Sequence, residues 1–449
     1  MKVVVVGAGL SGLAAAYRLQ QAGVDVEVVE ASTRPGGRCG VMRTHGFLVD
    51  MCPEISAASY HRFFALAKAA GLEADIVDCS TVISSLRNGK MVDIDTRSPL
   101  SLLFTPFLSW KAKLQLAIGL IRNFKLIKTA NAFKLGELAA LDDPKTSAED
   151  FAVKAFGREA ADYLIDPLMR TLGGSEMGKV SQLTALGGVN SWASSMVTIL
   201  GGLYRVPEGI ATQLRVRYNM RVAKVLEQGG GVDVGVVDAD GVAQTLRADH
   251  CIVSAQYDDA ERIFPGLAKY AGDFGRSLKY CRLIDLKLGY SVATRSKAYV
   301  AQAATIESPD LMMFALVHNK APDRAPPGHS LFTIYTDDAV WDRFAAMSDQ
   351  AIIDWGRERI ENWYPELKGH FVFGHVGREP RTAYFASPGF YRRTSTLFAN
   401  LAPSRVQLAG DLFGAGSMEA AVVWGEKAAD RVLSKIGKSV ESAPQLKAA

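Results

Sequence analysis

A short segment near the N-terminus limits the fold more than any other part of the chain. Residues 2–6, KVVVV, form a β-branched run that is typical of a strand buried on both faces. The turn GAGLSG follows at once, an Ala- and Leu-rich stretch then predicts a helix, and VDVEVVE predicts a second strand that ends at Glu30. This is a GxGxxG turn inside a βαβ unit, with an acid at the end of the second strand. The sequence therefore predicts an α/β fold that binds a dinucleotide.

Each residue type in this turn has a physical task. Gly7 allows the tight turn, Gly9 lets the backbone approach a pyrophosphate, and Gly12 lets the helix pack closely on the strand. The helix N-terminus offers positive partial charge and free N–H groups to the phosphates. The predicted cofactor contacts also include Leu10, Ser11 and Ala31, and Glu30 is expected to accept hydrogen bonds from the adenosine ribose hydroxyls. A glycine-rich turn without a ligand is the alternative interpretation.

The residues just beyond Glu30 distinguish one dinucleotide from another. RPGGR places Gly36, Gly37 and Arg38 where the chain can pass close to a second part of the ligand, and Arg38 can neutralise pyrophosphate charge. With this motif the sequence resembles the FAD-dependent amine oxidase superfamily, which includes monoamine and polyamine oxidases, protoporphyrinogen oxidases and phytoene-type desaturases. GFLVDMCPE resembles that superfamily's GxxxDxG stretch, although Cys52 stands where glycine is usual. The resemblance implies FAD as the cofactor.

A second loop, GDLFGAGSMEAAVVWGEKAAD at residues 410–430, has the same character as the first. The resemblance explains it, because in this superfamily a late segment folds back to hold the flavin half of FAD. It implies that Gly410, Asp411 and a helix beginning near Met418 contact the cofactor, and that the backbone of Val222 contacts adenine. The positions of a flavin-linked cysteine and a cage tyrosine read Pro380 and Arg381, so non-covalent FAD is expected.

The resemblance also implies a domain organisation. A Rossmann-like FAD-binding domain of the glutathione-reductase type is expected from residues 1–80, 201–270 and 396–437. The inserted substrate domain is expected to have a mainly helical part at 81–200 and a mixed β-sheet at 271–395, and 438–449 to form a flexible tail. Within the helical part, Ser147 is a candidate N-cap followed by apolar residues at helical spacing.

Composition excludes some functions. A net charge of +4 over 449 residues is too small to suggest a nucleic-acid partner. The cysteines are scattered without metal-ligand spacing, which predicts no metal site and a reducing, cytoplasmic compartment. The N-terminus superficially resembles a secretory signal, but its removal would delete a complete nucleotide site.

Residues 96–136 contain seven Lys or Arg and no acid around PLSLLFTPFLSWKAKLQLAIGLI. A basic amphipathic segment of this kind can lie on an anionic membrane surface and draw a lipophilic substrate from it. The alternative is an ordinary solvated cationic face. A further hypothesis is that two copies of the chain form a homodimer.

The reaction is predicted from what a flavin does, which is to accept hydride at N5. Asp285 is the candidate facing N5, with Lys287 in its place if the strand register differs by two residues, and Arg381 is the candidate for attracting a carboxylate. We therefore expect an oxidase or dehydrogenase of a lipophilic, anionic small molecule, with O2 or a quinone as the electron acceptor. The alternatives are a redox-neutral double-bond isomerase and a non-catalytic lipid-binding protein like the GDP dissociation inhibitors of small GTPases.

Overall fold

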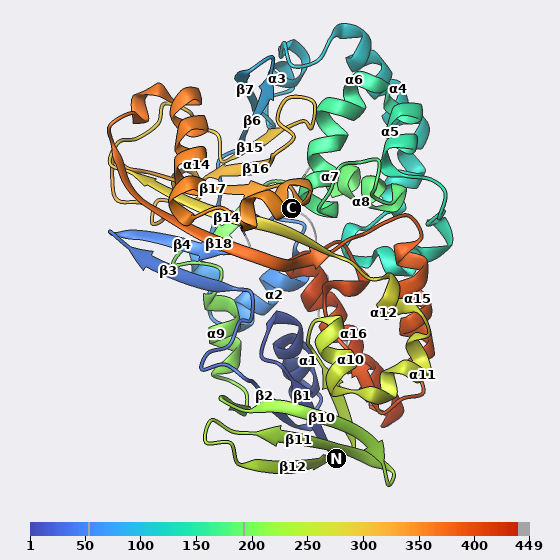
Figure 1. The fold of residues 1–449 in the computed structure, drawn as a ribbon. Helices are drawn as coiled ribbons and strands as arrows, with labels where there is room; N and C mark the ends of the chain where they lie inside the picture. The colour runs from blue at the N-terminus through green and yellow to red at the C-terminus, as the bar shows by residue number, and fades with distance from the viewer. Residues whose placement is uncertain (53, 192–193, 439–449) are drawn as a thin grey trace.

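A parallel sheet, a mixed sheet, smaller antiparallel sheets and a group of helices make up the computed structural model, which describes residues 1–52, 54–191 and 194–438. In Figure 1 the parallel sheet with its helices occupies the lower part of the molecule, and the mixed sheet and the helical part lie above it. Segments from both ends of the chain meet in the lower part, where α1 and α16 lie side by side. The predicted α/β class is confirmed.

The parallel sheet forms from the segments with the most continuous apolar runs. Its strand order is β19–β13–β1–β2–β9, and every neighbouring pair runs parallel. The strands are β1 (Lys2–Val6), β2 (Asp25–Val29), β9 (Val216–Arg217), β13 (His250–Val253) and β19 (Val406–Leu408). Helices α1 (Leu10–Gln21) and α16 (Met418–Lys435) pack against each other beside it. An antiparallel sheet of β10 (Arg221–Gln228), β11 (Gly231–Val237) and β12 (Ala243–Ala248) lies next to this layer.

The mixed sheet has the order β18–β14–β17–β16–β15–β6–β7. Its strands are β6 (Val82–Arg87), β7 (Lys90–Asp95), β14 (Tyr280–Tyr290), β15 (Val300–Ala303), β16 (Leu311–Leu316), β17 (Ser330–Thr336) and β18 (Phe371–Tyr384). The hairpin β6–β7 belongs to residues 81–200, which were expected to be mainly helical. It joins the sheet because β6 pairs in parallel with β15, a contact between segments more than 200 residues apart that a local pattern does not reveal.

The remainder of 81–200 is mainly helical, as predicted. The helices are α3 (Pro99–Phe104), α4 (Trp110–Thr129), α5 (Ala148–Phe156), α6 (Arg158–Ala160), α7 (Asp166–Gly173) and α8 (Gln182–Ser191). The N-cap predicted at Ser147 is confirmed: its hydroxyl accepts the N–H of Asp150, and the Asp150 carboxylate accepts the N–H of Ser147 in a capping box. No helix in the described part of the chain has both the length and the apolar character needed to cross a membrane.

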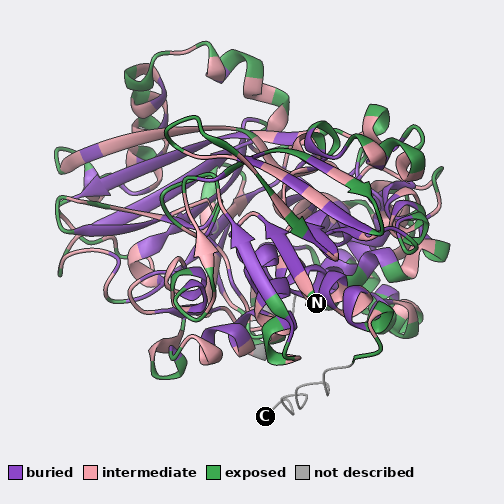
Figure 2. Ribbon diagram, turned by 90° about the horizontal axis from the view of Figure 1, so that it is seen from below, coloured by how far each residue is buried: buried purple, intermediate pink, exposed green. Residues whose placement is uncertain are grey.

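Shorter elements connect these layers. They are β3 (Gly40–Thr44), β4 (Phe47–Met51), α2 (His61–Ala69), β5 (Ile76–Asp78), β8 (Val197–Ile199), α9 (Arg205–Ala211), α10 (Tyr257–Ile263), α11 (Ala268–Ala271), α12 (Phe274–Ser277), α13 (Trp341–Ala345), α14 (Asp349–Trp363) and α15 (Phe390–Asn400). Figure 2 shows that the central strands are buried along most of their length, whereas many loops and helix ends are exposed. Residues 439–449 of the predicted tail lie outside the described residues. The assignment of segments to domains stays a prediction.

Candidate functional site

A cavity of about 610 Å³ lies where the two glycine-rich loops meet the mixed sheet. Its walls change character from one side to the other. On one side are backbone-rich segments of the first and second loops, including Gly9 and Gly410, and on the other are the apolar side chains of Leu283, Met312 and Met313. This combination suits a ligand that has a phosphate-bearing part and a less polar part.

The first loop leaves open space where a ligand would have to approach. A Cβ atom on Gly7, whose φ is +94°, would lie 2.5 Å from the Ser254 carbonyl oxygen, and one on Gly12 would lie 2.0 Å from the Gly7 oxygen. Gly7 and Gly12 are therefore required for chain packing. A Cβ on Gly9 would meet nothing within 4 Å, so glycine there keeps the cavity open. Helix α1 begins directly after Gly9 without a side-chain cap, which leaves its first N–H groups available to an anion.

Glu30 is held in position at the end of β2. One carboxylate oxygen accepts the Ala8 N–H at 2.7 Å, and the other accepts both the N–H and the hydroxyl of Ser32 at 2.8 Å. Each carboxylate oxygen has more than one lone pair, so a bound ribose can still donate to the group. Glu30 lines the cavity, whereas Ala31 is exposed and Val222 is buried in β10, and neither belongs to the described cavity lining.

Arg38 joins the two loops directly. Its guanidinium donates to the carboxylate of Asp411 at 3.0 Å and to the carbonyl of Thr382. The charge of Asp411 raises the pKa of Arg38 further above its usual value. The neighbouring Gly36 and Gly37 both have positive φ, and the Gly36 N–H donates to the Ala8 oxygen at 2.8 Å. The RPGGR motif thus packs against the first loop while its last residue reaches the second loop.

The helix predicted to begin near Met418 begins at Met418. Ser417 caps it by accepting the Ala420 N–H at 3.1 Å. A Cβ on Gly425 would lie 2.2 Å from the Ser11 carbonyl oxygen, so α16 reaches α1 only because residue 425 is glycine. Ser11 lines the cavity, and its hydroxyl has no hydrogen-bond partner among the described residues.

These observations fit the pyrophosphate and ribose of FAD. The free N–H groups of α1, the unpartnered hydroxyl of Ser11, the open space at Gly9 and the fixed carboxylate of Glu30 are the donors and acceptors that such a group requires. Of the residues predicted to bind the cofactor, the structure brings most to the cavity lining: Gly7, Gly9, Leu10, Ser11, Glu30, Gly36, Gly37, Arg38, Gly410, Asp411 and Met418.

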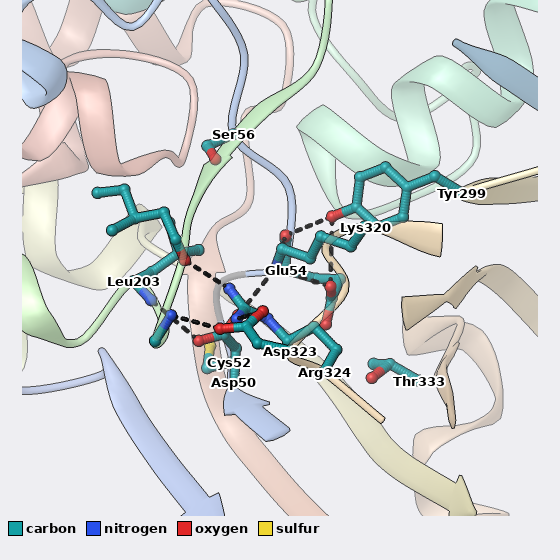
Figure 3. A network of polar contacts seen from close by, with 12 residues as sticks. Asp50, Cys52, Glu54, Ser56, Leu203, Tyr299, Lys320, Asp323, Arg324 and Thr333 are labelled. Atoms are coloured by element: carbon teal, nitrogen blue, oxygen red, sulfur yellow. Dashed lines mark hydrogen bonds and ion pairs between the residues drawn. The ribbon is translucent and has the colours of Figure 1, made fainter. Parts of the chain in front are cut away.

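A buried ionic network includes Asp50 of β4 and Glu54 just after it, and it was not predicted from the sequence. Lys320 donates to Asp50 and to Glu54, both at 2.9 Å, and the Arg324 guanidinium lies 3.4 Å from Asp50. Figure 3 shows these side chains converging with Tyr299. Burial alone would raise the pKa of Asp50, but the charges of Lys320 and Arg324 outweigh it and hold the pKa below its usual value. The motif HNKAPDR looks like an ordinary loop in the sequence, so only the tertiary fold reveals the pairing.

Asp285 and Lys287, the two register alternatives for one position, are bonded to each other. Both are buried on β14, with the Lys287 Nζ 2.8 Å from a carboxylate oxygen of Asp285. The same ammonium donates to the Thr333 hydroxyl at 3.2 Å. Burial raises the pKa of Asp285. Neither residue belongs to the described cavity lining, whereas Tyr335, which pairs with Asp285 across the sheet, does.

Arg381 does line the cavity, but its charge is offset. Its guanidinium donates to Asp258 at 2.8 Å and to Asp259 at 3.0 Å. The expectation of an anionic substrate depended on an uncompensated positive charge at this residue. Two carboxylates beside one guanidinium remove that electrostatic reason. Glu379, two residues earlier on β18, also lines the cavity and was not predicted.

Comparisons with known proteins agree with this geometry. A coproporphyrinogen III oxidase of Staphylococcus aureus is 31% identical over 188 residues, covering 40% of this chain and 38% of that protein. A polyamine oxidase 1 of Oryza sativa subsp. japonica is 31% identical over 283 residues, covering 56% of this chain and 52% of that protein. The matches thus span only part of the length of these curated relatives.

The structural similarity extends over much more of the chain than the two pairwise sequence matches do. The structure of a cyclohexylamine oxidase from Brevibacterium oxydans superposes with a TM-score of 0.75 at 18% identity, covering 97% of this chain and 99% of that one. A putrescine oxidase bound to putrescine superposes with a TM-score of 0.74 at 16% identity, with the same coverage. The family described as flavin containing amine oxidoreductase matches residues 10–433. This confirms FAD as the cofactor at the level of the family, and the chain belongs to the flavin-containing amine oxidoreductase family.

Proposed function

We propose that this protein is an FAD-dependent oxidoreductase that takes hydride from a C–H bond of a lipophilic small molecule, including a C–H bond next to nitrogen where a C–N bond is oxidised to C=N. The bound flavin would supply the electron sink, and O2 or a quinone would reoxidise it. The observation that carries the proposal is the continuity of the cavity, which runs from the phosphate-binding turn at Gly9 to the apolar wall of Leu283, Met312 and Met313. In this proposal FAD is held without a covalent bond. Pro380 and Arg381 stand where the family resemblance places a flavin-linked cysteine and a cage tyrosine.

The residues of the chain bind and orient the substrate, and they exclude water from the reacting bond. Leu283, Met312 and Met313 suit an apolar substrate body. Their side chains form an apolar wall, and an apolar ligand needs no hydrogen-bond partners there. We assign Asp285 a positioning role, exerted through its ion pair with Lys287 and its place beside Tyr335. Arg381, paired with Asp258 and Asp259, shapes the edge of the cavity.

The test is anaerobic mixing of the FAD-loaded protein with a panel of lipophilic amines, porphyrinogens and polyenes. Loss of flavin absorbance near 450 nm, together with one equivalent of oxidised product, is the expected result. An isomerised product without net loss of flavin absorbance would show that the protein is a redox-neutral isomerase and not an oxidoreductase. A protein that binds these compounds and converts none of them, even with O2 or a quinone present, would contradict the proposed catalysis.

We further propose that α3 and α4 rest on an anionic lipid bilayer. Trp110, Leu114, Ile121 and Phe124 recur along α4 at helical spacing and are between 61% and 76% exposed, while Ala112, Gly119 and Ile127 face the protein. Leu100 and Phe104 of α3 are also exposed, and the rings of Phe104 and Trp110 are in contact. The segment's lysines and arginines suit anionic headgroups, and its apolar side chains suit the acyl boundary.

A further inference from the structure

The charged side chains lining the cavity fall into two groups. In the first group each charge has a partner: Arg38 with Asp411, Arg381 with Asp258 and Asp259, and Glu54 with Lys320. Glu30 is likewise held by three hydrogen bonds. Glu379 differs, since its carboxylate has no hydrogen bond or ion pair within the part of the chain that the structure describes. It is a partly buried acid with free lone pairs in a cavity wall.

The position of Glu379 is set by β18 and its neighbour β14. Its backbone pairs with Leu283, an apolar residue of the cavity wall. Its Oε1 lies above Gly377, where a Cβ would be 3.8 Å from this oxygen and 3.4 Å from the Cβ of Asp285. The Glu379 carboxylate therefore lies near the side chain of Asp285, and the backbone pairing with Leu283 places it at the apolar side of the cavity.

Charged groups from two other segments, β14 and the RPGGR motif, act on Glu379. Burial and the nearby charge of Asp285 raise its pKa, whereas Lys287 on β14 and Arg38 of the RPGGR motif oppose that rise. Cys52, after β4, also lies within electrostatic range of Glu379. Lys287 forms its short contact with Asp285, so it does not neutralise Glu379 directly. Glu379 thus presents a negative charge at pH values above its raised pKa.

We propose that Glu379 binds the polar end of the substrate and selects a hydrogen-bond donor or a cationic group over a carboxylate. This rests on the proposed function, because it takes the apolar wall beside Glu379 as the substrate site. A donor would occupy the free lone pairs of Glu379, while an anion would meet its charge at short range in a partly desolvated site. Glu379 would thus favour a positively charged substrate group, whereas Arg381 without its acidic partners would favour a negatively charged one.

The test uses FAD-loaded protein and three probes of one shape: 2-naphthylmethylammonium, 2-naphthylmethanol and 2-naphthoate. Dissociation constants are measured from the perturbation of the flavin spectrum. Wild type is expected to bind the ammonium probe about tenfold or more tighter than naphthoate, with the alcohol between them. Glu379→Gln is expected to reduce that ratio to about twofold or less. As the pH falls, ammonium affinity is expected to decline with protonation of Glu379 in wild type but to stay constant in the Gln variant.

Glu358→Gln is the matched control, since it removes the same charge from an exposed position of α14 in the same domain. It is expected to keep the wild-type ratio. Equal binding of the three probes to wild type, a preference for naphthoate, failure of the ammonium probe to bind, or an unchanged ratio in Glu379→Gln would each overturn the inference. FAD content measured on the same samples distinguishes failure of the proposed function from failure of the role of Glu379. Protein that holds no FAD refutes the proposed function. FAD-loaded protein that does not select by charge refutes only the role of Glu379.

Discussion

At the scale of single residues, Glu30 shows how a local motif gains its geometry. The sequence places an acid at the end of a strand, and the fold then fixes both carboxylate oxygens through Ala8 and Ser32. An acceptor held in this way loses little further side-chain entropy when a ligand binds. The fixed carboxylate is why Glu30, rather than another acid near the turn, is expected to recognise the ribose.

Glu30→Ala is expected to weaken FAD binding, because each hydrogen bond to a charged acceptor is worth about 1.5–3 kcal/mol. The loss corresponds to roughly one to two orders of magnitude in Kd for one such bond. Equilibrium titration of the apoprotein with FAD measures it. Glu73→Ala, which removes an exposed acid paired with Lys68, serves as the control and should leave Kd unchanged. Equal FAD affinity in both variants would contradict the assignment.

Lys287→Met is expected to lower the free energy of unfolding by about 3–5 kcal/mol, since it leaves the Asp285 charge buried and unpaired. The double variant Asp285→Leu, Lys287→Met removes both charges and is expected to recover much of this loss. Chemical denaturation of wild type, Asp285→Leu, Lys287→Met and the double variant checks the expectation. Two single-site effects that simply add in the double variant would show that the two residues are not coupled.

At the scale of secondary-structure elements, the success of prediction depends on the distance over which a signal acts. The N-cap at Ser147 and the start of α16 were predictable because a cap and its helix are adjacent in sequence. The hairpin β6–β7 was not, because its sheet partner β15 lies in a distant part of the chain. The ion pairs of Lys320 and Arg381 could not be predicted for the same reason. The residues that contact the phosphates are local motifs, whereas those that set the substrate's environment are brought together by the fold.

Helix α4 provides a test of the membrane proposal at this scale. Ile121→Glu with Phe124→Glu places two negative charges on the exposed apolar face, and binding to phosphatidylserine-containing liposomes is expected to fall at least about tenfold. Val242→Glu, at another exposed apolar side chain that lies outside the segment, is the control. Co-sedimentation measures bound protein. Wild type that binds these vesicles no better than the double variant would remove the proposal.

At the scale of the whole molecule, stability is expected to depend on pH through His318. Burial lowers the pKa of His318 to about 4, because the charged ring would lose its hydration inside the fold. Because the unfolded state keeps the ordinary pKa of about 6.5, it binds the proton first as the pH falls. The contribution of neutral His318 to the free energy of unfolding is therefore complete above about pH 6.5. It is lost as the pH falls from about 6.5 to about 4.

The pH effect is measured by comparing unfolding free energies of wild type and His318→Gln from pH 7 to pH 4. The difference between the two proteins is expected to change by up to roughly 3 kcal/mol over this range, in the direction that weakens wild type at low pH. A difference that stays constant with pH would show that His318 does not titrate in this way.

The whole fold brings residues from the two ends of the chain to one cavity, and that is the central claim. Arg38 and Asp411, separated by more than 370 positions in the sequence, form an ion pair at its wall. Titration of the apoprotein with FAD tests the claim most directly, by flavin fluorescence and on wild type, Glu30→Ala and Asp411→Ala. Saturation at one FAD per chain, with weaker binding in both variants, is the predicted result. Failure of wild type to bind FAD, or tight binding of a nicotinamide dinucleotide in its place, would contradict it.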